Sequence, residues 1–429
     1  MGSHKFFRSE LLKNVLVLLT GTGFGQLITL LASPILSRLY SPAEYGVFTV
    51  FISTASMMAA ISAARYDLAI MLPKSNNRAI NVLMLALYVC ISFALSLFFL
   101  AVLIALLIHF DVLLWSELMT SWIWFFPFIV LLLGTQQIMN YWLVRNKEYG
   151  YIAITRISNS ASNNGLAVIF GFLKFKEWGI LLSNFIGQIV YSFHLFFLLR
   201  KKYKGEMAFV SKKKMKASAE IYKEFPRTSV SQAMIDIFQL NGIVYLLPVF
   251  FSIVEVGYYS RTFIVLQAPV SLIGTAIGQV FFQKASELHH AKSDLRPLIT
   301  ATIKKATLFI LPVSIILMIA GPVLFKFVFG NQWEESGYYS RILALWLFFD
   351  FIRISISSIP IILEKQRRMF VISMFGPLIL LVSMMIGHWY SNVYVALLTF
   401  AFGQSIFSIV LIKWIYKIST PKKLDGGAK

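Results

Sequence analysis

The sequence is poor in cysteine and in acidic side chains. Cys90 is the only cysteine among 429 residues, so an intramolecular disulfide and a thiolate metal site are both excluded. Only 14% of the residues are charged, against roughly 25% in an ordinary soluble domain. The 19 acidic residues are outnumbered by 39 Lys and Arg, for a net charge of +20. Nucleic-acid binders carry such an excess on polar surfaces, which this chain lacks, and we therefore expect no nucleic-acid partner.

Long apolar runs are what the chain has instead. Hydrophobic residues make up 58% of the sequence, and their runs of about 18 to 28 residues are long enough to cross a bilayer core of roughly 30 Å. A soluble enzyme, a secreted disulfide scaffold and a disordered chain are excluded. The pattern predicts an all-α polytopic membrane protein with twelve transmembrane helices, at about 12–36, 46–71, 79–108, 120–144, 151–173, 179–199, 229–251, 257–283, 303–328, 338–362, 370–390 and 393–416.

The distribution of Lys and Arg predicts the orientation of these helices. The N-terminus, the even-numbered connections and the C-terminal tail hold 30 of the 39 positive residues. The opposite face holds six, which are Arg38, Lys174, Lys176, Arg261, Lys326 and Arg341. Because positive residues accumulate on the cytoplasmic side, we expect both termini and the basic connection 200–228 to be cytoplasmic.

That connection divides the chain into two similar halves. Segment 41–48, SPAEYGVF, follows the first helix, and segment 252–259, SIVEVGYY, follows the seventh at an offset of 211 residues. Six helices per half predict two six-helix lobes of the same orientation, related by pseudo-two-fold symmetry, with a substrate path between them. We expect an N-terminal lobe at 1–200, a basic cytoplasmic linker at 201–228, a C-terminal lobe at 229–416 and a basic cytoplasmic tail at 417–429.

The short outer connections argue against an enzyme. A membrane enzyme would need an exposed loop carrying carboxylates or histidines, and the longest outer loop has about a dozen residues. P-loop, HExxH and Gly-x-Ser-x-Gly motifs are all missing from the sequence. We therefore predict a transporter with no metal site and no cofactor.

Six charged residues remain inside the predicted helices. They are Arg65, Asp67, Arg156, Asp236, Asp350 and Arg353. Each would cost at least about 2.5 kcal/mol facing lipid at a helix centre, so each should face a partner or a hydrated cavity. Arg65 and Asp67, two positions apart, would point to different faces of a helix, so no local ion pair is expected. Asp350 and Arg353, three apart, either neutralise each other or leave Arg353 available to a substrate.

The fifth helix is the most polar of the twelve. Arg156, Asn159, Ser160, Asn163 and Asn164 fall on one of its faces. Such a face either lines a hydrated path or joins helices by hydrogen bonds, and the arginine at its head favours the path.

The remaining charges favour an anionic substrate. A guanidinium group matches the geometry of phosphate and cannot lose its charge. Asp236 has no cation within one helical turn, and a buried carboxylate of this kind can carry a proton.

Four segments resemble bacterial Wzx-type polysaccharide flippases, of the multidrug/oligosaccharidyl-lipid/polysaccharide (MOP) exporter superfamily. They are 36–48 (LSRLYSPAEYGVF), 65–70 (RYDLAI), 134–147 (GTQQIMNYWLVRNK) and 329–343 (FGNQWEESGYYSRIL). The resemblance implies a MATE-like fold that moves undecaprenyl-pyrophosphate-linked oligosaccharide, an O-antigen or capsule repeat unit, from the cytoplasmic to the periplasmic leaflet of the bacterial inner membrane by alternating access. The bilayer, a polysaccharide polymerase and a chain-length regulator are the partners that this function implies.

The resemblance and the intramembrane charges together give the candidate residues. For substrate binding they are Arg65, Arg156, Asn159, Asn163, Arg261 and Arg353, and for ion coupling they are Asp67, Asp236 and Asp350. The coupling ion would be H⁺ or Na⁺. Relatives that flip the peptidoglycan precursor bind sodium through carboxylates on the seventh and eleventh helices, but the last two helices here contain no Asp or Glu, which favours H⁺. Two alternatives stay open: a cation-coupled multidrug exporter of the same superfamily, and a scaffold of a polysaccharide assembly complex that transports nothing.

Overall fold

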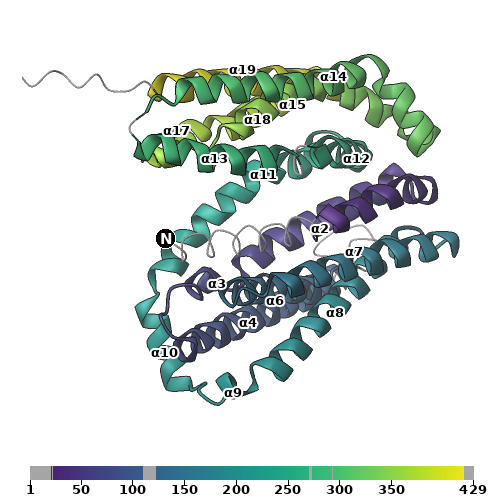
Figure 1. The fold of residues 1–429 in the computed structure, drawn as a ribbon. Coiled ribbons are helices and arrows are strands. Elements are labelled where there is room, and N and C mark those ends of the chain that lie inside the picture. Colours follow the sequence, from purple (N-terminus) through teal and green to yellow (C-terminus); the bar gives the residue numbers. More distant parts are fainter. Residues whose placement is uncertain (1–20, 22, 110–121, 270–272, 292, 420–429) are drawn as a thin grey trace, which may run out of the picture. The chain divides into compact units, whose positions relative to one another are not determined.

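The computed structural model describes residues 21, 23–109, 122–269, 273–291 and 293–419 (Figure 1). All regular elements within these residues are helices, which confirms the predicted all-α class. The helices form two compact units. Unit 1 comprises the chain up to Tyr40 and Phe48–Asn241, and unit 2 comprises Ser41–Val47 and the chain from Gly242 onward.

Unit 1 contains the helices of the first half of the chain and the basic segment that follows them. Its elements are the helical residues 23–39, α2 (Pro42–Ser62) beyond its first turns, α3 (Tyr66–Ala69), α4 (Asn76–His109), α6 (Phe126–Arg145), α7 (Tyr149–Phe172), α8 (Lys176–Lys202), α9 (Lys204–Met207), α10 (Lys212–Ile221), a π-helical turn (Phe225–Ser229) and the first part of α11 (Val230–Phe250). Leu83, Trp142 and Leu195, from α4, α6 and α8, meet in one of its buried clusters.

Unit 2 packs around the helix Glu334–Ser355, which contacts helices both before and after it in the chain. Its elements are the end of α11, α12 (Ile253–Pro269), α13 (Thr275–His290), α14 (Arg296–Phe329), a 3₁₀ turn (Asn331–Trp333), α15 (Glu334–Ser355), α16 (Ile359–Ile362), α17 (Gln366–Ser373), α18 (Phe375–Trp389) and α19 (Val393–Ile418). Helices α14 and α15 pack closely because Gly337 faces the α14 backbone. A Cβ atom there would lie 2.4 Å from Cα of Pro322.

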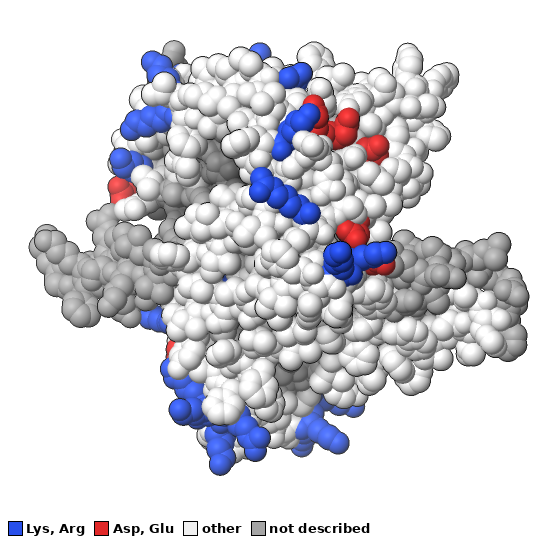
Figure 2. Space-filling view, turned by 90° about the vertical axis from the view of Figure 1, so that its right-hand side faces the viewer, with Lys and Arg blue, Asp and Glu red and all other residues white. Residues whose placement is uncertain are grey.

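Eight helices in the described part of the chain are long and apolar enough to cross a membrane, or nine if the bent pair within 225–250 counts as one span. The count of twelve therefore stays a prediction. Part of the first predicted helix, the outer loop 110–121 and the tail beyond 419 lie outside the described residues. Figure 2 shows a surface mostly without charged side chains. Large apolar side chains such as Phe99, Leu308 and Phe327 are exposed on the two units. Such a surface suits a lipid environment.

The basic segment 201–228 is folded and belongs to unit 1. It contains α9 and α10, and it is held to α4 through the side chain of Asn81. The Asn81 amide donates to the carbonyl of Phe209 at 3.2 Å, and its carbonyl accepts from the backbone N–H of Ser211 at 3.0 Å. The boundary between the units falls at Asn241, inside α11. The segment thus serves as a packed part of unit 1, whereas composition alone suggested a linker.

The two repeated segments cross at their glycines within unit 2. Segment 41–48 begins α2, and segment 252–259 begins α12. A Cβ atom on Gly46 would lie 2.0 Å from the carbonyl oxygen of Ile253, and one on Gly257 would lie 1.8 Å from the carbonyl oxygen of Pro42. Neither glycine has room for a side chain, so the sequence repeat is also a pair of reciprocal backbone contacts.

Candidate substrate-binding and ion-binding residues

The chain leaves helical geometry between α2 and α3, and this break positions two of the candidate charges. Ala64 and Arg65 have left-handed backbone angles, with φ of 48° and 61°. The expectation that Arg65 and Asp67 point to different faces assumed a continuous helix, and it is wrong for that reason. Nη1 of Arg65 lies 3.9 Å from Oδ2 of Asp67, so the two form a local ion pair.

Asp67 is the most enclosed of the candidate carboxylates, with an exposed side-chain fraction of 0%. Its Oδ2 accepts a hydrogen bond of 2.6 Å from the side-chain amide of Gln137 on α6. Among the described residues, no donor reaches Oδ1 of Asp67 and no acceptor reaches Nε of Arg65. A buried carboxylate, one guanidinium and one amide therefore form a polar site inside unit 1, with hydrogen-bonding capacity left over.

Arg145 holds the chain that follows this site, a role that sequence reasoning did not foresee. Its Nη1 donates to the carbonyl of Ile70 at 3.0 Å, and its Nη2 donates to that of Pro73 at 2.6 Å. Its Nε donates to Oδ1 of Asn76 at 3.2 Å. One side chain at the end of α6 thus fixes the turn between α3 and α4. The only signal in the sequence was its place in segment 134–147.

The polar face of α7 is divided between two neighbouring helices. Oγ of Ser160 donates to the carbonyl of Gly25 at 2.6 Å, and the Asn164 amide donates to Oγ1 of Thr29 at 3.1 Å. These two residues therefore join α7 to the helical residues 23–39, which is the interhelical role that the sequence left open.

Asn159 and Asn163 face α8 instead. A Cβ atom on Gly187 of α8 would lie 3.0 Å from Oδ1 of Asn159, and Oδ1 of Asn163 accepts from Oγ of Ser183 at 3.4 Å. Oδ1 of Asn159 is buried, with no hydrogen-bond donor among the described residues. Arg156 is half-buried one turn earlier on the same helix. Substrate binding by Arg156, Asn159 and Asn163 stays a prediction.

In unit 2, Asp350 and Arg353 form the ion pair that their spacing allowed. Oδ1 of Asp350 accepts from Nε of Arg353 at 2.8 Å and from Nη2 at 2.6 Å. Asp236 lies exposed on α11, so the expectation that it is a buried carboxylate is wrong. The fold thus brings Asp350 and Arg353 together. The other two candidate carboxylates, Asp67 and Asp236, lie on α3 and α11. Among the described residues, no three His, Cys, Asp or Glu side chains come together as metal ligands.

Arg261 on α12 is packed among aromatic rings and is only 2% exposed. Its guanidinium carbon lies 4.1 Å from the ring centre of Tyr45, 4.8 Å from that of Trp333 and 5.6 Å from that of Phe329. All four residues belong to unit 2. Cation–π contacts of this kind stabilise a buried guanidinium. Arg261 therefore has a packing role in unit 2, and its role in substrate binding stays a prediction.

The sequence matches the profile of a family described as polysaccharide biosynthesis protein over residues 35–338. A comparison with curated protein sequences gave no match. Among solved structures, an inward-facing multidrug resistance transporter of the MATE family, in the MOP superfamily, is 15% identical with a TM-score of 0.68, over 93% of this chain and 96% of that one. A MOP superfamily transporter from Pyrococcus furiosus, whose binding pocket is described as of reverse polarity, is 14% identical with a TM-score of 0.59, over 95% of each chain. These structures have the same fold as this chain.

Proposed function

Because the chain belongs to the polysaccharide biosynthesis protein family and has the fold of the MOP superfamily transporters, we propose that this membrane transporter is a lipid-linked oligosaccharide flippase. It would move undecaprenyl-pyrophosphate-linked repeat units of O-antigen or capsule from the cytoplasmic to the periplasmic leaflet. The family match supports polysaccharide assembly as the process, and the MOP fold supports alternating access as the mechanism.

One structural observation carries the choice of substrate. Arg65 lies inside a predicted membrane helix, its side chain is 19% exposed, and its Nη1 lies 3.9 Å from Oδ2 of Asp67, which is longer than a hydrogen bond. A guanidinium that is neither in water nor fully paired is costly in a membrane unless another anion meets it. A pyrophosphate supplies that anion, and the planar donors of arginine match its oxygens.

The candidate residues then take separate roles. Arg65 and Arg156 bind the pyrophosphate or acidic sugars, and Asn159 and Asn163 on α7 bind sugar hydroxyls. Arg353 contributes less, because Asp350 already accepts two of its hydrogen bonds.

Asp67, Asp236 and Asp350 are the groups that would respond to a coupling ion, either H⁺ or Na⁺. Oδ1 of Asp67 accepts no hydrogen bond from the described residues, so Asp67 is the strongest of the three candidates for binding the ion. From the distribution of Lys and Arg we propose an inner-membrane location with both termini in the cytoplasm, where the substrate-supplying enzymes, the polymerase and the chain-length regulator would be partners.

Complementation tests the proposal. A strain lacking its flippase should regain surface polysaccharide when this chain is expressed with a matching repeat unit. The variants Arg65→Ala and Arg156→Ala should express but fail to restore it, whereas Arg341→Ala, which removes an arginine bonded to the carbonyl of Ile319, should restore it. Full restoration by both Arg65→Ala and Arg156→Ala would refute the roles given to these arginines.

A cation-coupled multidrug exporter is the second candidate, because several of the similar structures are multidrug transporters. It predicts drug resistance on overexpression, and the three arginines inside the predicted helices disfavour an organic cation as the substrate. A scaffold that transports nothing is the third. Movement of labelled lipid-linked oligosaccharide by the purified protein in liposomes would support the flippase against both.

A further inference from the structure

Each unit has a pocket at the beginning of its longest helix. Helices α4 and α14 both contain 34 residues. The pocket at the start of α4 has a volume of about 530 Å³, and the pocket at the start of α14 has a volume of about 450 Å³. Neither pocket is lined by a residue proposed to bind the substrate or the coupling ion.

The pocket of unit 1 contains cations and no carboxylate. Arg78 of α4 and Lys214 of α10 line it, and both are exposed. Within the part of the chain that the structure describes, neither forms a salt bridge. Ser75 and Tyr222 bring hydroxyl groups to the same lining, whereas Oγ of Ser218 already donates to the carbonyl of Lys214 at 2.9 Å.

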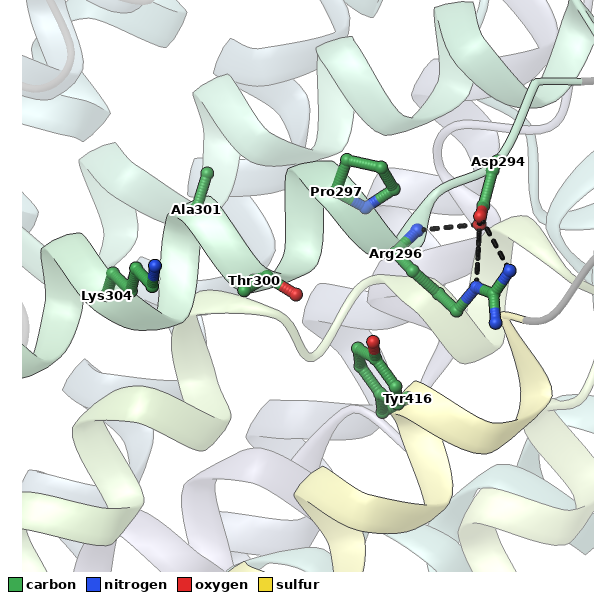
Figure 3. A pocket seen from close by; sticks show the side chains of 7 residues that line it. All are labelled: Asp294, Arg296, Pro297, Thr300, Ala301, Lys304 and Tyr416. Atoms are coloured by element: carbon green, nitrogen blue, oxygen red, sulfur yellow. Dashed lines mark hydrogen bonds and ion pairs between the residues drawn. The ribbon is translucent and has the colours of Figure 1, made fainter.

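The pocket of unit 2 repeats these side-chain types (Figure 3). Arg296 and Lys304 of α14 line it together with Thr300, and Tyr416 reaches it from α19. It differs by one carboxylate. Asp294 accepts from Nε and Nη2 of Arg296, at 3.0 and 2.8 Å to Oδ2, so part of the Arg296 charge is already balanced.

The two pockets also occupy equivalent places along the chain. Counting the predicted membrane helices, α4 is the third of the first half and α14 is the third of the second half. A tyrosine lines each pocket from a later element: Tyr222 directly follows α10 in the basic segment 201–228, and Tyr416 lies near the end of α19. Two cations, a tyrosine and a small hydroxyl side chain therefore recur in both halves, on different residues.

These groups match one ligand chemistry. Lys and Arg donate charge-assisted hydrogen bonds to phosphate oxygens, and hydroxyl groups donate further ones. The adjoining apolar side chains, such as Ile221 and Ala301, suit the glycerol and upper acyl carbons of a lipid. We propose that each pocket binds the phosphate headgroup of an anionic phospholipid. The unit 1 pocket binds it more tightly, because Asp294 offsets the charge of the unit 2 pocket.

The test compares neighbouring lysines on one helix. The purified full-length protein is titrated with phosphatidylglycerol and phosphatidylcholine in detergent, and bound lipid is counted by native mass spectrometry. Lys214→Ala and Lys304→Ala remove a pocket cation. Lys213→Ala and Lys305→Ala are matched controls, because each removes an exposed lysine next along the helix that lines neither pocket.

We expect phosphatidylglycerol to bind in preference to phosphatidylcholine, and each pocket variant to weaken it about fivefold. The double variant Arg78→Ala/Lys214→Ala should lose about 25-fold, and the controls should stay within about twofold of the wild type. Equal losses in controls and pocket variants would overturn the proposal in favour of diffuse attraction. Equal binding of the two lipids would overturn it as well.

Inorganic phosphate separates a lipid site from a simple anion site. We expect millimolar phosphate to leave phosphatidylglycerol binding unchanged, since free phosphate lacks the apolar part of the ligand. Displacement of the lipid by phosphate would overturn the lipid assignment. These measurements need no transport, so their outcome is independent of the proposed flippase activity.

Discussion

The side-chain amide of Gln137 donates a hydrogen bond of 2.6 Å to Oδ2 of Asp67. This bond joins α6 to α3, directly after the left-handed residues Ala64 and Arg65. The carboxylate is enclosed, so the amide and the guanidinium of Arg65 are what compensate its charge. The polar site of unit 1 therefore depends on a backbone break that places three polar side chains together.

Replacing Gln137 by Ala should destabilise the protein. The carboxylate of Asp67 would lose the hydrogen bond from the Gln137 amide while staying buried, and a buried acceptor left in this way costs about 1–3 kcal/mol. Thermal unfolding of the purified protein should shift down by about 2–5 °C. Ser96→Ala, on the exposed side of α4, is the control and should leave the midpoint unchanged. An unchanged midpoint for Gln137→Ala would contradict the importance of this bond.

The Arg65–Asp67 pair should show coupling in a double-mutant cycle. Arg65→Ala leaves the enclosed carboxylate without its cation, at a cost of roughly 3 kcal/mol. Asp67→Asn removes that charge but keeps an oxygen for Gln137. We therefore expect the double variant Arg65→Ala/Asp67→Asn to unfold at a higher temperature than Arg65→Ala alone. Purely additive effects would mean that the two side chains do not interact.

Alanine at either crossing glycine should be strongly destabilising. A Cβ atom at Gly46 or Gly257 would overlap a backbone carbonyl, which cannot rotate away, so a helix must move at a cost of roughly 3 kcal/mol or more. Gly165→Ala is the matched control, because no atom lies within 4 Å of the added group, and helix propensity favours alanine by up to ~1 kcal/mol. Yield and unfolding midpoint should therefore fall for the first two variants and hold or rise for the third.

The variant Arg261→Lys should be less stable than the wild type. It keeps the charge but loses the planar group that lies over the rings of Tyr45 and Trp333, and a loss of roughly 1–2 kcal/mol is expected. Arg341→Lys is the comparison, since that guanidinium lies near one ring, 5.6 Å from the centre of Tyr338. If both variants unfold at the same temperature, the aromatic contacts of Arg261 contribute little.

Asp294 should give a pH dependence only in acid. The hydrogen bond from the Arg296 side chain lowers the pKa of this carboxyl below its ordinary value of 3.8. A lowered pKa means that the interaction is fully present above the ordinary pKa and is lost as pH falls through the lower folded value. The difference in unfolding midpoint between wild type and Asp294→Asn should therefore stay constant from about pH 8 to about pH 5 and shrink below about pH 4. A change centred near neutral pH would contradict this assignment.

Regular helices were predictable from the sequence, and departures from them were not. Apolar runs located α4 and α14, because bilayer thickness sets the length of an apolar run that can cross it, although α14 begins at Arg296, before the predicted start at 303. The Arg65–Asp67 pair was missed because residue spacing was converted into direction with a helical period. Two consecutive non-glycine residues with positive φ give no signal of that kind in the sequence.

The partners of polar residues were the second feature that the sequence did not predict. The polar residues of α7 were expected to share one face, and a face covers enough arc to meet two neighbouring helices. Ser160 contacts the helical residues 23–39, whereas Asn163 contacts α8. Tertiary packing decides between these neighbours, and the sequence of one helix does not contain that information.

The first turns of α2 belong to unit 2, while the rest of that helix belongs to unit 1. A polypeptide cut in the basic segment near 228 would therefore yield a C-terminal fragment without Tyr45 and Gly46, the residues that cover Arg261 and cross Gly257. The two units are interleaved along the chain. When the two halves are expressed as separate polypeptides, the C-terminal one should accordingly fold only when the N-terminal one is co-expressed.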